Sequence, residues 1–217
     1  MSQVIIGADG IEYVIELNAD LSQADFYGED LGRAFLKGAD LSESDLSNAN
    51  LSGANLTDVD LSESTLMNTN FRNSCLQGSN FDGTDLRNAY LMGAQMEGVR
   101  LNFAILSGMN LNNFDFSKAE LRYANLDFTH LQNAILNNSD MQGASLYQSN
   151  LSGAQLQSTD LSDANMNECI LLGANLSNAN VSFCNLSNAV LQHADLTDIL
   201  YNDETIWPEG FELPDSR

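Results

Sequence analysis

The chain has 217 residues, of which 43% are hydrophobic, and its formal net charge is −22. A chain of this length can bury a core, and its charge excludes nucleic acid and anionic membranes as natural partners because both would be repelled. No apolar run approaches the ~20 residues of a membrane span, and no charged segment followed by an apolar one opens the chain, so we expect a single-domain soluble protein of the cytoplasm.

Residues 1–18 are predicted to form a short hairpin-like N-terminal cap. An apolar run at 4–6 precedes a turn-like Ala-Asp-Gly stretch at 8–10. Beyond this turn, apolar residues alternate with other residues, as in a half-buried strand. They are Ile11, Tyr13, Ile15 and Leu17.

A five-residue repeat governs the chain from Leu21 to Leu196. Every fifth residue there is Leu, Phe, Met or Val, which gives 36 repeat centres without an insertion; the centre is called position i. An α-helix, with about 3.6 residues per turn, would rotate successive centres by roughly 140°, and a flat strand would alternate them between its two faces. The chain must therefore turn once per repeat, which is the pattern of a solenoid.

The other positions show how each repeat is built. Position i−2 is Ala in 19 of the 36 repeats and Ser or Thr in ten more, so it is predicted to point inward beside the larger centre. Position i−1 is Asp or Asn in 22 repeats and is predicted to face solvent. Position i+2 is Gly or Asn in 20 repeats, and because both residues tolerate turn geometry, the corner is predicted near i+1 and i+2.

The repeat resembles the A-(D/N)-L-x-x motif of the pentapeptide-repeat family. The motif is visible as Ala19-Asp20-Leu21-Ser22-Gln23 and again at 49–53 and 174–178, and the resemblance covers residues 19–198. It implies an all-β fold, a right-handed quadrilateral β-helix with four repeats per coil, in which residues twenty apart stack. The repeats would then make about nine coils and, at ~4.8 Å per coil, a rod of about 43 Å.

Residues 199–217 are predicted to form a C-terminal cap and tail, because both ends of a solenoid expose core and unpaired backbone. Ile199, Tyr201 and Ile206 continue the inward phase, and residues 207–211 break it and should fold over the last coil. The stretch 205–211 is similar to the tails that close many cyanobacterial pentapeptide-repeat proteins.

The residues of a catalyst are largely missing. The only histidines, His130 and His193, are far apart in the sequence and no nucleophile motif accompanies them. No Gly-rich phosphate loop follows a strand, and no zinc-type ligand spacing occurs. We therefore expect no catalytic residue, no metal, no cofactor and no enzymatic activity. Cys169 and Cys184 replace the small residue at i−2 and are predicted to be core thiols.

Acidic residues gather in one predicted column of i−1 positions and the corner beside it. If residues twenty apart stack, ten acids share this face with only two bases, Arg100 and Arg122. Either Asp and Asn are simply the outward residues that the repeat prefers, and keep the protein soluble, or the face binds a protein partner with a basic surface. The ten acids are Asp20, Asp40, Glu43, Asp60, Glu63, Asp82, Glu120, Asp140, Asp160 and Asp163.

The resemblance adds a sharper hypothesis. Family members linked to fluoroquinolone resistance are rod-shaped dimers that resemble B-DNA in size and charge and bind type II topoisomerases. Residues 19–198 carry 22 acids and 7 bases, about three-fifths of the charge of duplex DNA of that length. No loop interrupts the repeats, which argues against an activity that needs projecting loops. The sequence thus favours a non-enzymatic acidic rod, a protein-interaction or structural module; the alternative is a DNA-mimicking inhibitor of DNA gyrase.

A second candidate surface lies in the C-terminal coils. Ile170 and Val190 occupy outward i−1 positions twenty residues apart, and Leu172 occupies i+1 on the same side. Stacked on adjacent coils, these residues would form an apolar patch, and such patches mark interfaces. The patch either joins two copies in a homodimer or is covered by the tail around Trp207, and the sequence leaves both open.

Overall fold

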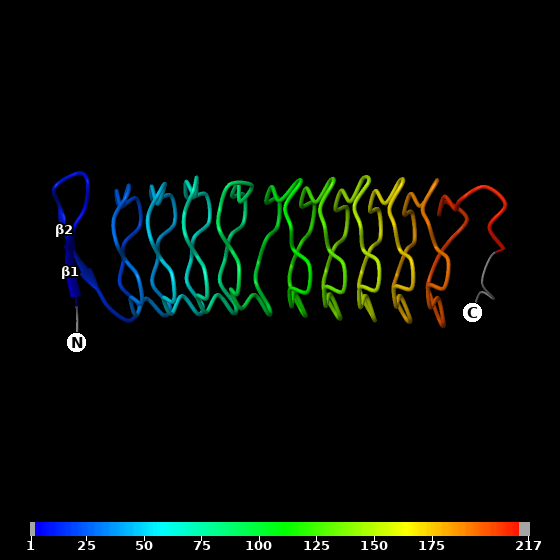
Figure 1. Cartoon of the computed structure of the whole chain (residues 1–217), viewed down its shortest axis with the longest axis horizontal. Helices are drawn as coiled ribbons and strands as arrows, with labels where there is room; N and C mark the ends of the chain where they lie inside the picture. Colours follow the sequence, from blue (N-terminus) through cyan, green and yellow to red (C-terminus); the bar gives the residue numbers. More distant parts are fainter. Residues whose placement is uncertain (1–2, 213–217) are drawn as a thin grey trace. The chain divides into compact units, whose positions relative to one another are not determined.

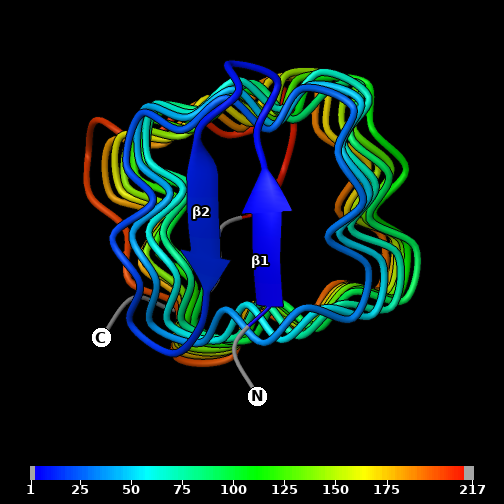
Figure 2. The ribbon, with the colours of Figure 1, turned by 90° about the vertical axis from the view of Figure 1, so that its left-hand side faces the viewer.

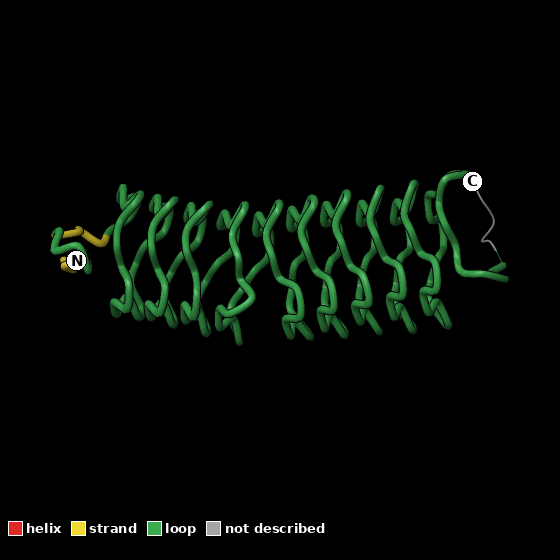
Figure 3. Tube along the Cα trace, turned by 90° about the horizontal axis from the view of Figure 1, so that it is seen from above, coloured by secondary structure: helices red, strands yellow, loops and turns green. Residues whose placement is uncertain are grey.

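The computed structural model describes residues 3–212 and contains no helix among them. The described chain divides between Ala104 and Ile105 into two compact units, called unit 1 and unit 2 (Figure 1). Its only strands longer than one residue are β1, Gln3–Ile6, and β2, Glu12–Ile15, and the remainder is turns and single-residue bridges (Figure 3).

Each unit is a stack of coils in which residues twenty apart lie side by side, as the family resemblance implies. Parallel bridges join i−1 positions, for example Asp20 to Asp40 in unit 1 and Glu120 to Asp140 in unit 2. The backbone on both sides of a bridge is bonded to the next coil: the Leu21 N–H donates to the Asp40 carbonyl at 2.7 Å. Within each unit, the coils trace a four-sided outline (Figure 2).

The corners lie at i+1 and i+2, where the turns occur, in agreement with the prediction. Between residues 16 and 200, every residue with a positive φ stands at i+2, from Asn18 at 55° to Asp198 at 56°. This left-handed conformation is nearly free of cost for Gly and tolerable for Asn, which explains why these residues recur there.

The interior consists of the centres and the small residues at i−2. Leu51 and Ala49, a centre and its i−2 neighbour, are both 0% exposed. Where i−2 is Ser or Thr, the hydroxyl finds a partner inside the coil: the Ser44 hydroxyl donates to the Leu41 carbonyl at 2.6 Å. Each buried Leu contributes about 1.5–3 kcal/mol to stability, so the repeated centres carry the fold.

The first residues form an antiparallel hairpin across the open end of unit 1 (Figure 2). The side chains of Ile5 on β1 and Ile15 on β2 are buried on the inner side of the hairpin. The Tyr13 ring packs against Phe26, with ring centroids 4.9 Å apart. The predicted alternation from Ile11 to Leu17 does not place all four apolar residues inward, however. Ile11 and Leu17 are exposed because they lie outside β2, where the chain no longer follows the strand.

The predicted inward position of Ile206 is wrong, because the stretch 201–205 contains one residue more than the repeat. The last bridge joins Asn185 to Ile206, a spacing of 21 residues in place of 20. Ile206 therefore stands at an outward position and is 53% exposed, whereas Thr205 takes the inward place. Trp207 becomes the next centre and stacks on Phe211, with centroids 5.2 Å apart.

Candidate functional site

The side chains at i−1 have a structural task in every coil. The Asp40 Oδ1 atom accepts the Ser42 N–H at 2.9 Å and the Ser42 hydroxyl at 2.6 Å, which fixes the start of the corner. Asn50 does the same without a charge, since its Oδ1 accepts the Ser52 N–H at 3.2 Å. The turn needs an oxygen two residues before it, which Asp and Asn supply equally well. A negative charge at i−1 is therefore not required by the fold.

Unit 1 nevertheless stacks charged residues at this position in three successive coils. Asp20, Asp40 and Asp60 are joined by consecutive bridges. Glu43 and Glu63 stand exposed at the neighbouring corner, where the Gln23 side-chain amide donates to Glu43 at 3.1 Å. With coils ~4.8 Å apart, carboxylates in adjacent coils lie well within one Debye length of each other. We call Asp20, Asp40, Glu43, Asp60 and Glu63 the acidic face.

Local hydrogen bonds favour the charged form of this face at its first coil. The Ser22 hydroxyl and N–H both donate to Asp20, and they hold the pKa of its carboxyl below the usual value. No Lys or Arg among the described residues forms an ion pair with any of the five carboxylates. The face thus presents concentrated negative charge to solvent.

The sixth predicted acid of unit 1 differs from these five. Asp82 is half-buried, forms an ion pair with Arg100 and accepts the Asn102 N–H at 2.8 Å. Its charge is therefore compensated within the unit, and it closes the acidic face at this coil.

Unit 2 holds the remaining four predicted acids. Glu120, Asp140 and Asp160 form one column of bridges, and Asp163 stands at the adjoining corner. Arg122 pairs with Asp140 at 3.0 Å, which reduces the net charge of this column. The ten predicted acids therefore fall into two sets, six residues in unit 1 and four in unit 2.

The sequence analysis did not identify a second acidic column in unit 1. Asp25 and Asp45 are bridged to each other on the side of the coil that follows the acidic face. Their signal was present in the sequence, because both occupy i−1 and are twenty residues apart.

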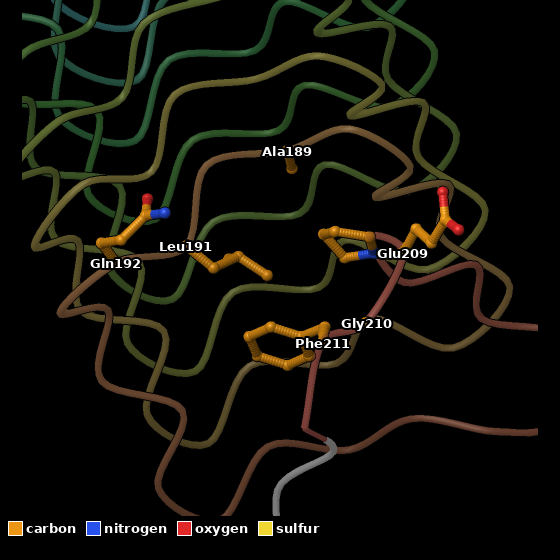
Figure 4. A pocket seen from close by; sticks show the side chains of 7 residues that line it. Ala189, Leu191, Gln192, Glu209, Gly210 and Phe211 are labelled. Atoms are coloured by element: carbon orange, nitrogen blue, oxygen red, sulfur yellow. The ribbon is translucent and has the colours of Figure 1, made fainter.

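The predicted apolar patch of unit 2 is assembled and accessible. Ile170 and Val190 are bridged neighbours, each 37% exposed, and Leu172 is 46% exposed. In the described part of the tail, Pro208 to Phe211 line a small open pocket together with Ala189, Leu191 and Gln192 (Figure 4).

Two of the three cysteines are buried in unit 2, and the third, Cys75, is a partly exposed free thiol. Cys169 and Cys184 are buried, and burial raises the pKa of the Cys169 thiol to about 12 and that of Cys184 further. Within residues 3–212, no group of three or more His, Cys, Asp or Glu side chains is arranged to hold a metal. That same part of the chain has no helix of the length and apolarity that a membrane span needs.

The chain matches a known family of repeat proteins in sequence and is similar to solved structures of such proteins. The family model for pentapeptide repeats finds eight copies, whose matched segments run from residues 19–58 to 169–199. The structure is similar to that of HetL, a pentapeptide repeat protein involved in heterocyst differentiation regulation from the cyanobacterium Nostoc sp. strain PCC 7120, with 27% identity over 88% of this chain and 92% of that one and a TM-score of 0.42.

Two further solved structures are similar in fold. Rfr23 from the cyanobacterium Cyanothece 51142 is 23% identical over 64% of this chain and 90% of its own, with a TM-score of 0.39. QnrB1, a plasmid-mediated fluoroquinolone resistance protein, is 16% identical over 82% of this chain and 89% of its own, with a TM-score of 0.38. No curated protein sequence matches the chain significantly. The family model spans the repeats from one end to the other, and the chain belongs to the pentapeptide-repeat family, whose members form right-handed quadrilateral β-helices.

Proposed function

We propose that the protein is a non-enzymatic interaction module whose acidic face binds a basic surface of another protein. The observation that carries this proposal is the stack of Asp20, Asp40 and Asp60, because Asn at each place would make the same turn without charge. Like charges in adjacent coils repel one another and lower stability. A basic partner would offset this repulsion, which gives the charges a function beyond the fold.

The test exchanges the charges of the acidic face for amides of the same shape. The face variant carries Asp→Asn at Asp20, Asp40 and Asp60 and Glu→Gln at Glu43 and Glu63. The control variant removes the same number of charges elsewhere, by neutralising Asp195, Asp198, Asp203, Glu204 and Glu209. Both variants and the wild-type protein are used for affinity capture from the source cell, followed by identification of the bound proteins and measurement of their affinities.

The expected result is a partner that the wild-type and control proteins retain and the face variant loses, with at least tenfold weaker binding. Its affinity should fall as salt rises, since screening weakens surface charges. If the face variant and the control variant captured the partner equally well, the acidic face would not be the binding surface.

The regular spacing of the acidic columns favours one specific class of partner as the alternative. A type II topoisomerase binds the evenly spaced phosphates of DNA, and stacked carboxylates could replace them. In that case the protein inhibits supercoiling by DNA gyrase, and the inhibition weakens when Asp20, Asp40, Asp60, Asp140 and Asp160 become Asn. Undiminished supercoiling at high protein concentration and low salt would retire this alternative.

For the apolar patch of unit 2 we propose self-association into a homodimer. Ile170, Leu172 and Val190 are exposed together, and a two-fold contact would let the same patch meet itself. Replacing the three residues with Ser should convert a dimer into a folded monomer in sedimentation experiments. Wild-type protein that sediments as a monomer at tens of micromolar would show that the patch is not such an interface.

A further inference from the structure

The outer face of the N-terminal hairpin is apolar and uncovered. Val4 and Val14 stand directly opposite each other on β1 and β2 and are 57% and 44% exposed, and Ile6 is 59% exposed. Glu12 lies on the same face, opposite Ile6, and is exposed as well. We call Val4, Ile6, Glu12 and Val14 the cap face.

A hairpin that only closed the end of unit 1 would not need this face. Its inner side already closes the unit, because Ile5 and Ile15 are buried there and the Ala8 N–H donates to the Asp25 carbonyl at 2.9 Å. The terminal elements of a solenoid ordinarily present a polar outer surface. Strands that are apolar on both faces are typical of strands covered on both faces.

The β1 edge of this two-stranded sheet is also unprotected. Edge strands usually avoid new pairing by carrying charges or Pro. The described part of β1 continues as Val4-Ile5-Ile6 with neither, so its composition favours contact with another chain.

The charge of the hairpin indicates which kind of chain would bind the cap face. The hairpin and the segment that joins it to the first coil carry three acids, Asp9, Glu12 and Glu16, and no Lys or Arg. A second copy of the protein would bring the same three acids to the contact, which opposes association. A segment with apolar residues bordered by Lys or Arg meets both properties of the face, its apolar centre and its acidic surroundings.

We propose that the cap face binds a peptide segment of another protein in which apolar residues are flanked by Lys or Arg. The site shares no residue with the acidic face of unit 1. It is therefore a second interaction surface, and its failure would leave the proposed role of the acidic face intact.

The test selects binders from a displayed library of random peptides against the wild-type protein. The cap variant carries Val4→Thr, Ile6→Thr and Val14→Thr, because Thr keeps the shape and strand preference of the side chain and adds a hydroxyl. A charge variant carries Glu12→Gln alone. The acidic-face variant described above serves as the control, and thermal unfolding of every variant verifies that the hairpin substitutions leave the fold in place.

The expected peptides combine apolar residues with Lys or Arg, and they bind the cap variant at least tenfold more weakly than the wild type. Glu12→Gln should weaken binding several-fold at low salt, and the acidic-face variant should bind normally. Three results would overturn the proposal: no enriched peptide, peptides without basic residues, or equal affinity for the wild type and the cap variant. A wild-type dimer that the cap variant abolishes would also overturn it, since the occupant would then be a second copy.

Discussion

The ring of Tyr123 lies over Gly143, one coil further along unit 2, so closely that a Cβ atom on Gly143 would clash with it. Gly143 also has a φ of 67°, in the left-handed region. Two separate demands therefore meet at one corner, a backbone conformation that disfavours side chains and a ring that occupies the space a side chain would take. Gly173 meets the first demand alone, because its φ is 65° and nothing lies within 4 Å of its added Cβ.

The pair predicts unequal costs for the same substitution. Gly173→Ala should lower the free energy of unfolding by about 1 kcal/mol, the cost of a left-handed Ala. Gly143→Ala should lower it by a further ~1–3 kcal/mol, because the ring must move. Denaturant unfolding measures both values.

A double variant separates the two causes. With Tyr123→Ala present, Gly143→Ala should cost no more than Gly173→Ala does. Equal costs of the two Gly→Ala changes in the wild-type background would mean that the Tyr123 ring moves aside freely.

A second prediction concerns an aromatic residue at another corner. Phe183 has a φ of 62° and is 54% exposed, so its backbone is strained while its ring gains little from burial. Phe183→Asn should raise the free energy of unfolding by about 0.5–1 kcal/mol, because Asn tolerates the left-handed region better than Phe. Thermal and denaturant unfolding detect a change of this size.

Tyr27→Asn is the matched control for this substitution. Tyr27 is equally exposed, at 53%, but stands at i+1, where φ is not positive. Its replacement should be neutral or slightly destabilising. If Phe183→Asn behaved in the same way, relief of backbone strain would not be the determining effect.

The sequence predicted the repeated part of the fold because each position of the repeat has one environment. A centre such as Leu51 is buried and its i−2 partner Ala49 is buried with it, so the period defines the repeat. The family resemblance added that four repeats make a coil, and this located the acidic columns, since bridges join residues twenty apart. The period could not predict which long side chains form ion pairs between coils. Arg100 neutralises Asp82 across 18 residues, a contact that depends on how the guanidinium bends within the unit.

The ends of the chain were predicted less well, for a physical reason. The extra residue before Thr205 shifts the phase, and a single shift exchanges inward and outward sides, so that Ile206 became exposed. In the N-terminal hairpin, alternation alone did not show that β2 ends at Ile15 or that Val4 would remain uncovered. Where the repeat stops, local packing against the adjacent coil determines burial.

The buried thiols predict how stability changes at alkaline pH. Burial raises the pKa of Cys169 from its ordinary value of 9.0 to about 12, and Cys184 is raised for the same reason. In the unfolded chain both thiols lose their protons above pH 9.0, whereas in the folded protein they keep them. The unfolded state then binds fewer protons, so the free energy of unfolding falls as pH rises from the unfolded pKa towards the folded one. Each thiol contributes a loss of about 1.4 kcal/mol per pH unit in that range.

Urea unfolding at pH 8 and pH 10 under reducing conditions tests this linkage. The wild-type protein should lose roughly 3 kcal/mol more between the two pH values than a Cys169→Ala, Cys184→Ala double variant. Ala suits both sites, because it is the commonest residue at i−2. The variant starts from a lower stability, since the Cys169 thiol donates to the Leu146 carbonyl at 2.8 Å. Every other group titrates in both proteins, so only the difference between their pH dependences reports the thiols. Parallel losses in the two proteins would show that the thiols can ionise without unfolding and that the core admits water at these positions.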